Sequence, residues 1–331
     1  MIGQKLAIEA GGILSTIGQT PLIRLSRVLG NVPCSVYAKL EAVNPGGSIK
    51  DRPALNIIKR AIEQGEIGAG TTVVESSSGN MGIGLAQTCS YFGLKFICVV
   101  DSKSTSQHIR LLRAYGAEVD VVTEPDPQAG ELLQARINRV KALLSSIPGA
   151  YWPNQYSNEY NSRAHHNTMS EIAAAFEEGP DYLFCATSTC GTLRGCAEYV
   201  RDNRLNTTVV AVDAVGSVIF GGPKAKRLIP GHGAARTPEL FQEDLAHKFI
   251  YVSDVDCIAG CRRLVRDEAI LAGGSSGAVV MAAERIKSEL RDGSICVLIF
   301  PDRGERYLDT IYSDSWVTEH FGDLSHLWSR P

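Results

Sequence analysis

Short apolar runs and amphipathic segments alternate along most of this 331-residue chain. Ser35–Leu40 is an apolar run with the length of a buried strand. In Asp51–Gln64 the apolar residues Leu55, Ile58 and Ile62 recur at the spacing of one helix face. The same reasoning predicts strands at Thr72–Glu75, Lys95–Val100, Glu118–Val122, Tyr182–Ala186, Val209–Val212 and Ile295–Phe300, and helices at Gly79–Phe92, Thr105–Tyr115, Gln128–Leu144 and Ala278–Ile286, with another starting near Leu193.

This regular alternation predicts an α/β protein with parallel sheets flanked by helices. Parallel sheets bind ligands at the carboxyl ends of their strands, so chemistry is expected in the turns that follow the predicted strands. The stretch Tyr151–Tyr160 is polar, aromatic and non-periodic, and it is the expected boundary between two lobes.

The composition narrows the class of protein. With 44% hydrophobic residues the chain can bury a sizeable core, and a formal net charge of -3 argues against nucleic acid or an anionic membrane as a partner. Apolar runs such as Ile295–Phe300 are too short to cross a bilayer. Glu9 stands where a signal peptide has its apolar centre. We therefore expect a cytoplasmic protein that binds neither nucleic acid nor membrane.

The nine cysteines do not indicate a metal site. None forms a Cys-x-x-Cys pair, and Cys257 and Cys261, four residues apart on one predicted helix face, lack the two further ligands that zinc would need. Reduced cysteines that act as small core residues are the simpler interpretation, so no metal is expected.

One short motif raises a question of chemistry. Lys50 stands in Asn-Pro-Gly-Gly-Ser-Ile-Lys-Asp-Arg (residues 44–52), between a glycine turn and a predicted helix. A lysine there can be a solvated surface charge, can bind a phosphate or can form a Schiff base. The motif alone leaves all three open.

A loop rich in serine and glycine follows the next predicted strand. It reads Glu-Ser-Ser-Ser-Gly-Asn-Met-Gly-Ile-Gly (residues 75–84) and opens a helix, so its backbone N–H groups could bind an anion. Asp101 ends the following strand roughly where a dinucleotide fold has its ribose-binding acid. The glycines, however, follow the order G-x-x-G-x-G rather than G-x-G-x-x-G, which disfavours a dinucleotide.

Two further loops carry hydroxyl groups at predicted helix starts. Residues 187–192, Thr-Ser-Thr-Cys-Gly-Thr, suit a phosphate but lack the ending of a nucleotide-triphosphate loop. Residues 272–277 read Ala-Gly-Gly-Ser-Ser-Gly. Each loop alone could be a helix cap. Together with Lys50 and Asn80 they match a cofactor with a phosphate, a carbonyl and a ring that needs hydrogen bonds, as pyridoxal phosphate has.

This set of motifs resembles the cysteine synthase and cystathionine β-synthase family of pyridoxal-phosphate enzymes. The resemblance runs from Ile-Gly-Gln-Thr-Pro-Leu at residues 17–22 to Pro-Asp-Arg-Gly-Glu-Arg-Tyr-Leu at residues 301–308. It implies a fold type II enzyme of two α/β lobes with the cofactor between them, normally a homodimer. The smaller, mobile lobe with the substrate loop is expected at residues 41–152, and the larger lobe at residues 1–40 and 153–331.

The resemblance also implies a role for each motif. Lys50 matches the Schiff-base lysine, which can later remove the α-proton, and Asn80 matches the residue that hydrogen-bonds the ring hydroxyl. Ser275 matches the hydroxyl that faces the pyridine nitrogen, and such a neutral partner suits elimination from the β-carbon. The matching phosphate cup is Ser188, Thr189, Cys190, Gly191 and Thr192, and the matching loop for the substrate α-carboxylate is Ser77, Ser78, Gly79 and Met81.

Several residues depart from ordinary cysteine synthases. Met81 stands where those enzymes usually have threonine, the cup is not Gly-Thr-Gly-Gly-Thr, and Pro-Asp-Arg-Gly at residues 301–304 replaces a Pro-Ser-Ser-Gly type turn. With residues 151–156 and 213–221, these features are similar to a branch of the family from siderophore pathways. The resemblance implies a transferase that joins O-phospho-L-serine to L-glutamate by β-replacement and supplies the precursor of 2,3-diaminopropionate.

Such a site must hold a leaving dianion and a dicarboxylic nucleophile, so it needs cations. Arg136 is the first candidate, with an exposed helix residue as the alternative. Tyr156 and Ser188 are candidate contacts, and Tyr156 could instead pack between the lobes. Arg303 and Arg306 are further candidates, whose turn could be purely structural.

Two other functions stay open. Nothing in the sequence excludes a cysteine synthase that uses O-acetylserine and sulfide, because sulfide needs almost no binding site. The other is a catalytically silent homologue that acts as a binding partner, against which the intact Lys50, Asn80 and Ser275 argue.

Overall fold

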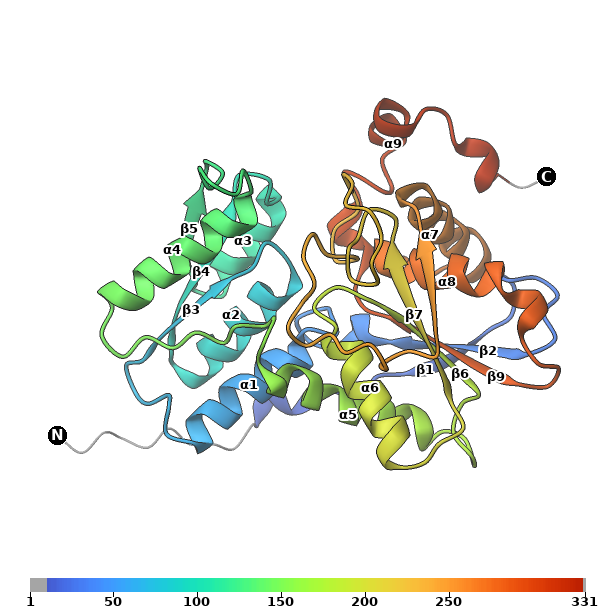
Figure 1. Ribbon diagram of the computed structural model, residues 1–331, viewed down its shortest axis with the longest axis horizontal. Coiled ribbons are helices and arrows are strands. Elements are labelled where there is room, and N and C mark those ends of the chain that lie inside the picture. The colour runs from blue at the N-terminus through green and yellow to red at the C-terminus, as the bar shows by residue number, and fades with distance from the viewer. Residues whose placement is uncertain (1–10, 330–331) are drawn as a thin grey trace. The chain divides into compact units, whose positions relative to one another are not determined.

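The computed structural model describes residues 11–329 (Figure 1). Residues 1–10, including the Glu9 on which the argument against a signal peptide rests, lie outside the described residues. The described chain divides into two compact units, one made of residues 11–17 and 50–161 and the other of residues 18–49 and 162–329. The predicted lobe of residues 41–152 overlaps the first unit, and its mobility stays a prediction.

A parallel sheet in the order β3-β4-β5 forms the centre of the first unit (Figure 1). Helices alternate with its strands along the chain, as the hydrophobic pattern predicts. The elements are α1 (Asp51–Glu63), β3 (Thr72–Ser76), α2 (Asn80–Phe92), β4 (Lys95–Asp101), α3 (Ser106–Ala114), β5 (Glu118–Val122) and α4 (Leu132–Ser146).

Helices cover both faces of this sheet. Val73 and Cys98 belong to a buried cluster with residues of α1 and α2. The alternate residues Val74 and Val99 point to the other face, where they pack with Val140 of α4. Because successive side chains of a strand alternate between faces, a sheet covered on both sides needs continuous apolar strands.

The second unit is built on a six-stranded sheet in the order β1-β2-β9-β6-β7-β8. Only the β1–β2 pair is antiparallel within this sheet; the other pairs, including Ser35↔Ile295 between β2 and β9, are parallel. The predicted α/β architecture with parallel sheets flanked by helices is confirmed. The strands are β1 (Leu22–Leu25), β2 (Ser35–Leu40), β6 (Tyr182–Ala186), β7 (Thr208–Ala214), β8 (Lys248–Val252) and β9 (Ile295–Phe300).

The faces of this larger sheet pack on different helices. Phe184 and Leu298 lie in the buried cluster that includes α7 and α8, whereas Leu183 and Val297 face the cluster that includes α5 and α6. The helices are α5 (Glu159–Ala173), α6 (Gly191–Asp202), α7 (Asp254–Glu268), α8 (Gly274–Arg285) and α9 (Asp314–Phe321), with short 3-10 helices at Glu41–Val43, Lys287–Glu289, Gly304–Tyr307 and Ser325–Leu327. A further 3-10 helix, Gly12–Thr16, belongs to the first unit.

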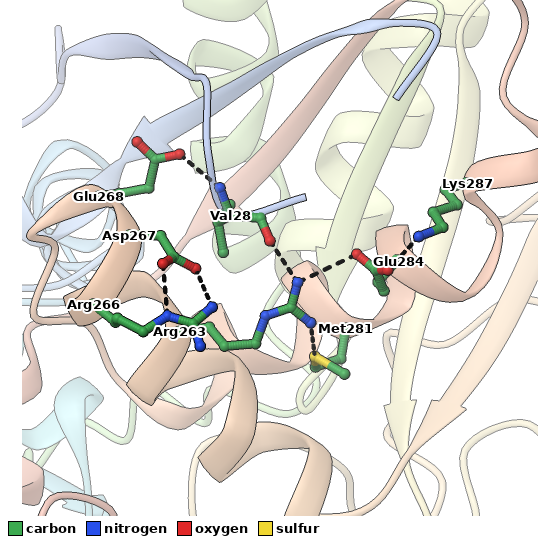
Figure 2. Close-up of polar contacts among 8 residues, drawn as sticks. All are labelled: Val28, Arg263, Arg266, Asp267, Glu268, Met281, Glu284 and Lys287. Atoms are coloured by element: carbon green, nitrogen blue, oxygen red, sulfur yellow. Dashed lines mark hydrogen bonds and ion pairs between the residues drawn. The ribbon is translucent and has the colours of Figure 1, made fainter. Parts of the chain in front are cut away.

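A single carboxylate attaches the β1–β2 connection to α7 (Figure 2). Oε1 of Glu268 accepts hydrogen bonds from the backbone N–H groups of Ser26, Arg27 and Val28, at 3.0, 2.7 and 3.0 Å. The guanidinium of Arg263 donates to the carbonyl oxygen of Val28 at 2.5 Å. These contacts satisfy backbone groups that no strand or helix pairs, so the connection is held without regular secondary structure.

Candidate active site

The serine-rich loop lies between the end of β3 and the start of α2. Ser77 is buried, and its Oγ accepts hydrogen bonds from the N–H of Gly79 (3.3 Å) and of Gly82 (2.9 Å), which fixes the first turn of the helix. Ser78 and Gly79 are exposed, whereas the Met81 side chain is buried in a hydrophobic cluster. The loop therefore offers an anion the positive end of a helix dipole, and Met81 can contribute only through its backbone.

Lys50 occupies the N-cap of α1, and its carbonyl oxygen accepts a hydrogen bond from the N–H of Ala54 at 3.0 Å. α2 packs closely on this turn, because a Cβ at Gly84 would stand 3.0 Å from the Lys50 carbonyl oxygen. A Cβ at Gly82 would stand 3.0 Å from Sγ of Cys98. Gly84 therefore lets α2 pack against the turn that carries Lys50, and Gly82 lets it pack against β4.

Arg136 is buried in α4 rather than exposed, so the alternative of a solvated helix residue is wrong. Its Nε lies 3.2 Å from Oδ2 of Asp101, at the end of β4, and both side chains are 9% exposed. Asp101 also accepts a hydrogen bond from the N–H of Lys103 at 3.0 Å. The acid that the sequence places at a ribose-binding position is thus the partner of Arg136.

Glu75 has a buried carboxyl at the end of β3. The sequence motifs did not indicate it as a site residue. Oε1 accepts hydrogen bonds from the N–H of Ser76 (2.7 Å) and from Nε1–H of Trp152 (3.1 Å), and Oε2 accepts from the N–H of Gln155 (3.2 Å). Burial raises the pKa of Glu75 to about 7, although these donors and the charge of Arg136 lower it. The carboxyl ties the segment before Tyr156 to the end of β3.

The predicted phosphate cup lies between the end of β6 and the start of α6. Cys190 precedes the helix with φ of +64°, a left-handed conformation that non-glycine residues adopt at a cost. Gly191 and Thr192 form the first turn, and Oγ1 of Thr189 accepts a hydrogen bond from the N–H of Gly191 at 3.4 Å. With the half-buried Ser188, the segment presents hydroxyls and a helix N-terminus, which is the donor set a phosphate requires.

The cup departs from a glycine-rich sequence for a packing reason. The side chain of Cys190 lies in a small buried cluster with Ile219 and Leu240. Next to the cup, Oγ1 of Thr187 donates to Oδ1 of Asp213 at 3.1 Å, and the carbonyl oxygen of Thr187 accepts from the N–H of Gly233. The long connection between β7 and β8 is therefore attached to the base of the cup.

The glycine-serine loop places Ser275 in the first turn of α8, where it is 5% exposed. A Cβ at Gly273 would stand 2.0 Å from Oδ1 of Asp302, and one at Gly277 would stand 2.1 Å from the carbonyl oxygen of Cys257 in α7. Only glycine fits at these positions. The turn at residues 301–304 is therefore packed against this loop.

Arg303 and Arg306 donate hydrogen bonds to backbone carbonyl oxygens. Nε of Arg303 donates to the carbonyl oxygen of Ala42 at 2.9 Å, and the Arg306 guanidinium donates to that of Gly46. Both side chains bind the backbone of residues 42–46, which supports the structural interpretation of these arginines.

Three features at helix starts fit the parts of pyridoxal phosphate. The cup of hydroxyls fits its phosphate, the buried serine fits its ring nitrogen, and the lysine fits its carbonyl. Residues 13–302 match the family described as "Pyridoxal-phosphate dependent enzyme", and the chain belongs to this family. The predicted cofactor, pyridoxal phosphate, is thereby confirmed.

The chain is similar to several individual enzymes over most of its length. The chain is 47% identical over 309 residues to N-(2-amino-2-carboxyethyl)-L-glutamate synthase of Ralstonia nicotianae, covering 93% of this chain and 91% of that one. An O-acetylserine dependent cystathionine beta-synthase from Helicobacter pylori superposes with a TM-score of 0.84, 32% identity, and 91% and 98% coverage. O-ureido-L-serine synthase superposes with a TM-score of 0.85 and 31% identity. That match covers 95% of this chain and 97% of that one. The predicted family is confirmed.

Residues 11–329 contain neither a candidate membrane span nor a candidate metal-binding cluster. No helix there is long and apolar enough to cross a membrane. No group of three or more histidine, cysteine, aspartate or glutamate side chains in that part of the chain could hold a metal ion.

Proposed function

We propose that this enzyme joins O-phospho-L-serine and L-glutamate to give N-(2-amino-2-carboxyethyl)-L-glutamate and phosphate. The observation that carries the proposal is the 47% identity, over 93% of the chain, to a synthase named for that product. The product serves as a precursor of 2,3-diaminopropionate in the biosynthesis of siderophores or related compounds. The enzyme acts in the cytoplasm as a homodimer.

The cofactor, when bound, supplies a ring that withdraws electrons from the α-carbon of the substrate. Lys50 would hold the cofactor through its carbonyl and would serve as the base that removes the α-proton of the substrate. Asn80 would donate a hydrogen bond to the ring hydroxyl, and Ser275 would offer the pyridine nitrogen a neutral hydroxyl. The phosphate binds in the cup, Ser188, Thr189, Cys190, Gly191 and Thr192.

The α-carboxylate of the substrate binds at the N-terminus of α2. The exposure of Ser78 and Gly79, and the helix turn fixed by Ser77, support this assignment. Tyr156 and Ser188 contact the substrate. Arg136 provides the positive charge, and it binds an anionic group of the substrate in place of Asp101.

A product assay tests the proposal. Purified enzyme is given O-phospho-L-serine with L-glutamate, or O-acetyl-L-serine with sulfide, and products are identified by mass spectrometry. The proposal expects the glutamate adduct and an equal amount of phosphate from the first pair. Cysteine formed only from the second pair would instead support a cysteine synthase, the alternative that the sequence leaves open.

A further inference from the structure

A buried histidine contacts the phosphate cup from the neighbouring helix. His165 of α5 has no solvent exposure, and its Nε2 lies 3.3 Å from Oγ1 of Thr192. Its Nδ1 lies 3.2 Å from Oγ1 of Thr168, one turn further along α5. The three side chains form a continuous polar chain, Thr168–His165–Thr192, that ends at the first turn of α6.

A glycine makes this approach possible. A Cβ at Gly195, three residues after Thr192 on α6, would stand 2.0 Å from the carbonyl oxygen of Ser162 and 2.7 Å from Cβ of His165. The two helices therefore pack in direct backbone contact at this point. That packing, and not local sequence, brings the imidazole to the cup.

We propose that His165 is a positioning residue of the phosphate cup: protonated at Nε2, it donates to Oγ1 of Thr192 and so directs the hydroxyl proton of Thr192 toward the cofactor phosphate. The inference rests on the proposed role of Thr192 in the cup. A threonine hydroxyl has one proton and two lone pairs, and a phosphate dianion only accepts hydrogen bonds. When Nε2–H occupies one lone pair of Oγ1, the single proton is left for the anion.

The proposed tautomer requires that the Thr168 hydroxyl donate to Nδ1 of His165. When the Thr168 hydroxyl donates to Nδ1, the ring proton must reside on Nε2, as with histidine ligands oriented by their second nitrogen. In the opposite tautomer Nε2 would accept the Thr192 proton, and Oγ1 would turn lone pairs toward a dianion. A hydrogen bond to a charged group would then be lost.

Four single variants of the holoenzyme separate this role from mere packing. His165→Gln keeps an amide donor near the position of Nε2, whereas His165→Asn is too short to reach Thr192. Thr192→Val removes the hydroxyl and keeps the shape. His166→Asn is the matched control, because the adjacent His166 ring lies 3.1 Å from Oε2 of Glu198 instead of in the cup. Readouts are the rate of cofactor loss from the holoenzyme and the 31P chemical shift of the bound cofactor.

His165→Asn is expected to lose the cofactor about tenfold faster and to shift the 31P signal, as the loss of one hydrogen bond to an anion predicts. His165→Gln restores most of both values, and His166→Asn leaves them unchanged. The double variant with Thr192→Val loses the cofactor no faster than Thr192→Val alone, because both changes remove the same bond.

Wild-type values for His165→Asn would overturn the proposal. So would equal losses in the Asn and Gln variants, or effects of His165→Asn and Thr192→Val that add, because these indicate a packing role only. A wild-type protein that binds no cofactor would instead contradict the proposed function, whereas a Thr192→Val effect without a His165 effect would leave that function standing.

Discussion

At the scale of single residues, three buried groups in the first unit share one electrostatic environment. Arg136 pairs with Asp101 at 3.2 Å, and its charge also lowers the pKa of Glu75. Burial nevertheless dominates at Glu75, because removing a carboxylate from water costs more than its hydrogen bonds return. A pKa of about 7 places the titration of Glu75 near neutral pH.

The raised pKa of Glu75 predicts a specific pH dependence of stability. Its ordinary pKa is 4.5 and the folded value is about 7, so the folded state holds the proton more tightly. The stabilisation is complete below about pH 4.5 and is lost as the pH rises toward 7, to a total on the order of a few kcal/mol. Glu75→Gln should remove this decline, measured by urea unfolding between pH 5 and 7.5.

Glu118→Gln is the control for Glu75, because Glu118 is an exposed carboxyl of β5 in the same sheet. It should leave the pH profile of the wild type unchanged. If Glu75→Gln and the wild type lose stability in parallel over this pH range, the titration of Glu75 is not the cause.

The proposed substrate role of Arg136 predicts separate effects on binding and on the cofactor. Arg136→Lys keeps the buried charge but loses the planar fork that binds carboxylate or phosphate in a bidentate manner. The KM for O-phospho-L-serine or L-glutamate should rise about tenfold, while the visible spectrum of the bound cofactor stays the same. Steady-state kinetics with each substrate varied measure this. A lowered melting temperature with unchanged KM values would assign Arg136 a structural role only.

At the scale of elements, the hydrophobic pattern predicted the strands of the three-stranded sheet and the four inner strands of the six-stranded sheet. It missed β1 and β8, which form the two edges of the six-stranded sheet. Edge strands have one neighbour and a solvent side, so their pattern is weaker; Phe249 of β8 is 50% exposed. The predicted helix at Gln128–Leu144 starts instead at Leu132, because Oδ1 of Asp126 binds the N–H groups of residues 128 and 129 in a turn.

The pattern also placed the start of α8 four residues late, and packing explains why. The predicted start is Ala278, whereas α8 begins at Gly274 and meets α7 at Gly277. Gly277→Ala would put a Cβ 2.1 Å from the Cys257 carbonyl oxygen, so the helices must separate. We expect a loss of several kcal/mol of stability and weaker cofactor binding, because Ser275 moves with the helix.

Gly68→Ala is the matched control for Gly277, since a Cβ at Gly68 meets nothing within 4 Å. It should leave both the urea midpoint and the affinity for pyridoxal phosphate near those of the wild type. A Gly277→Ala protein as stable as the control would show that α7 and α8 can adjust without cost.

At the scale of the whole chain, residues with proposed roles come from both units: Lys50 and Asn80 from the first, the cup and Ser275 from the second. These positions could be predicted from motifs of consecutive residues, because each motif marks a turn followed by a helix start. The pairing of Arg136 with Asp101 and of His165 with Thr192 could not be found in this way. Those pairs join elements far apart in sequence, and only the packing of helices and sheets brings them together.

The proposed function requires that the enzyme use O-phospho-L-serine first and L-glutamate second. Its most direct test is the visible absorption spectrum of the purified protein, titrated with each in turn. We expect a Schiff-base band that O-phospho-L-serine converts to a new band and that L-glutamate, but not other amino acids, restores. A band that responds only to O-acetyl-L-serine and is restored by sulfide would contradict it.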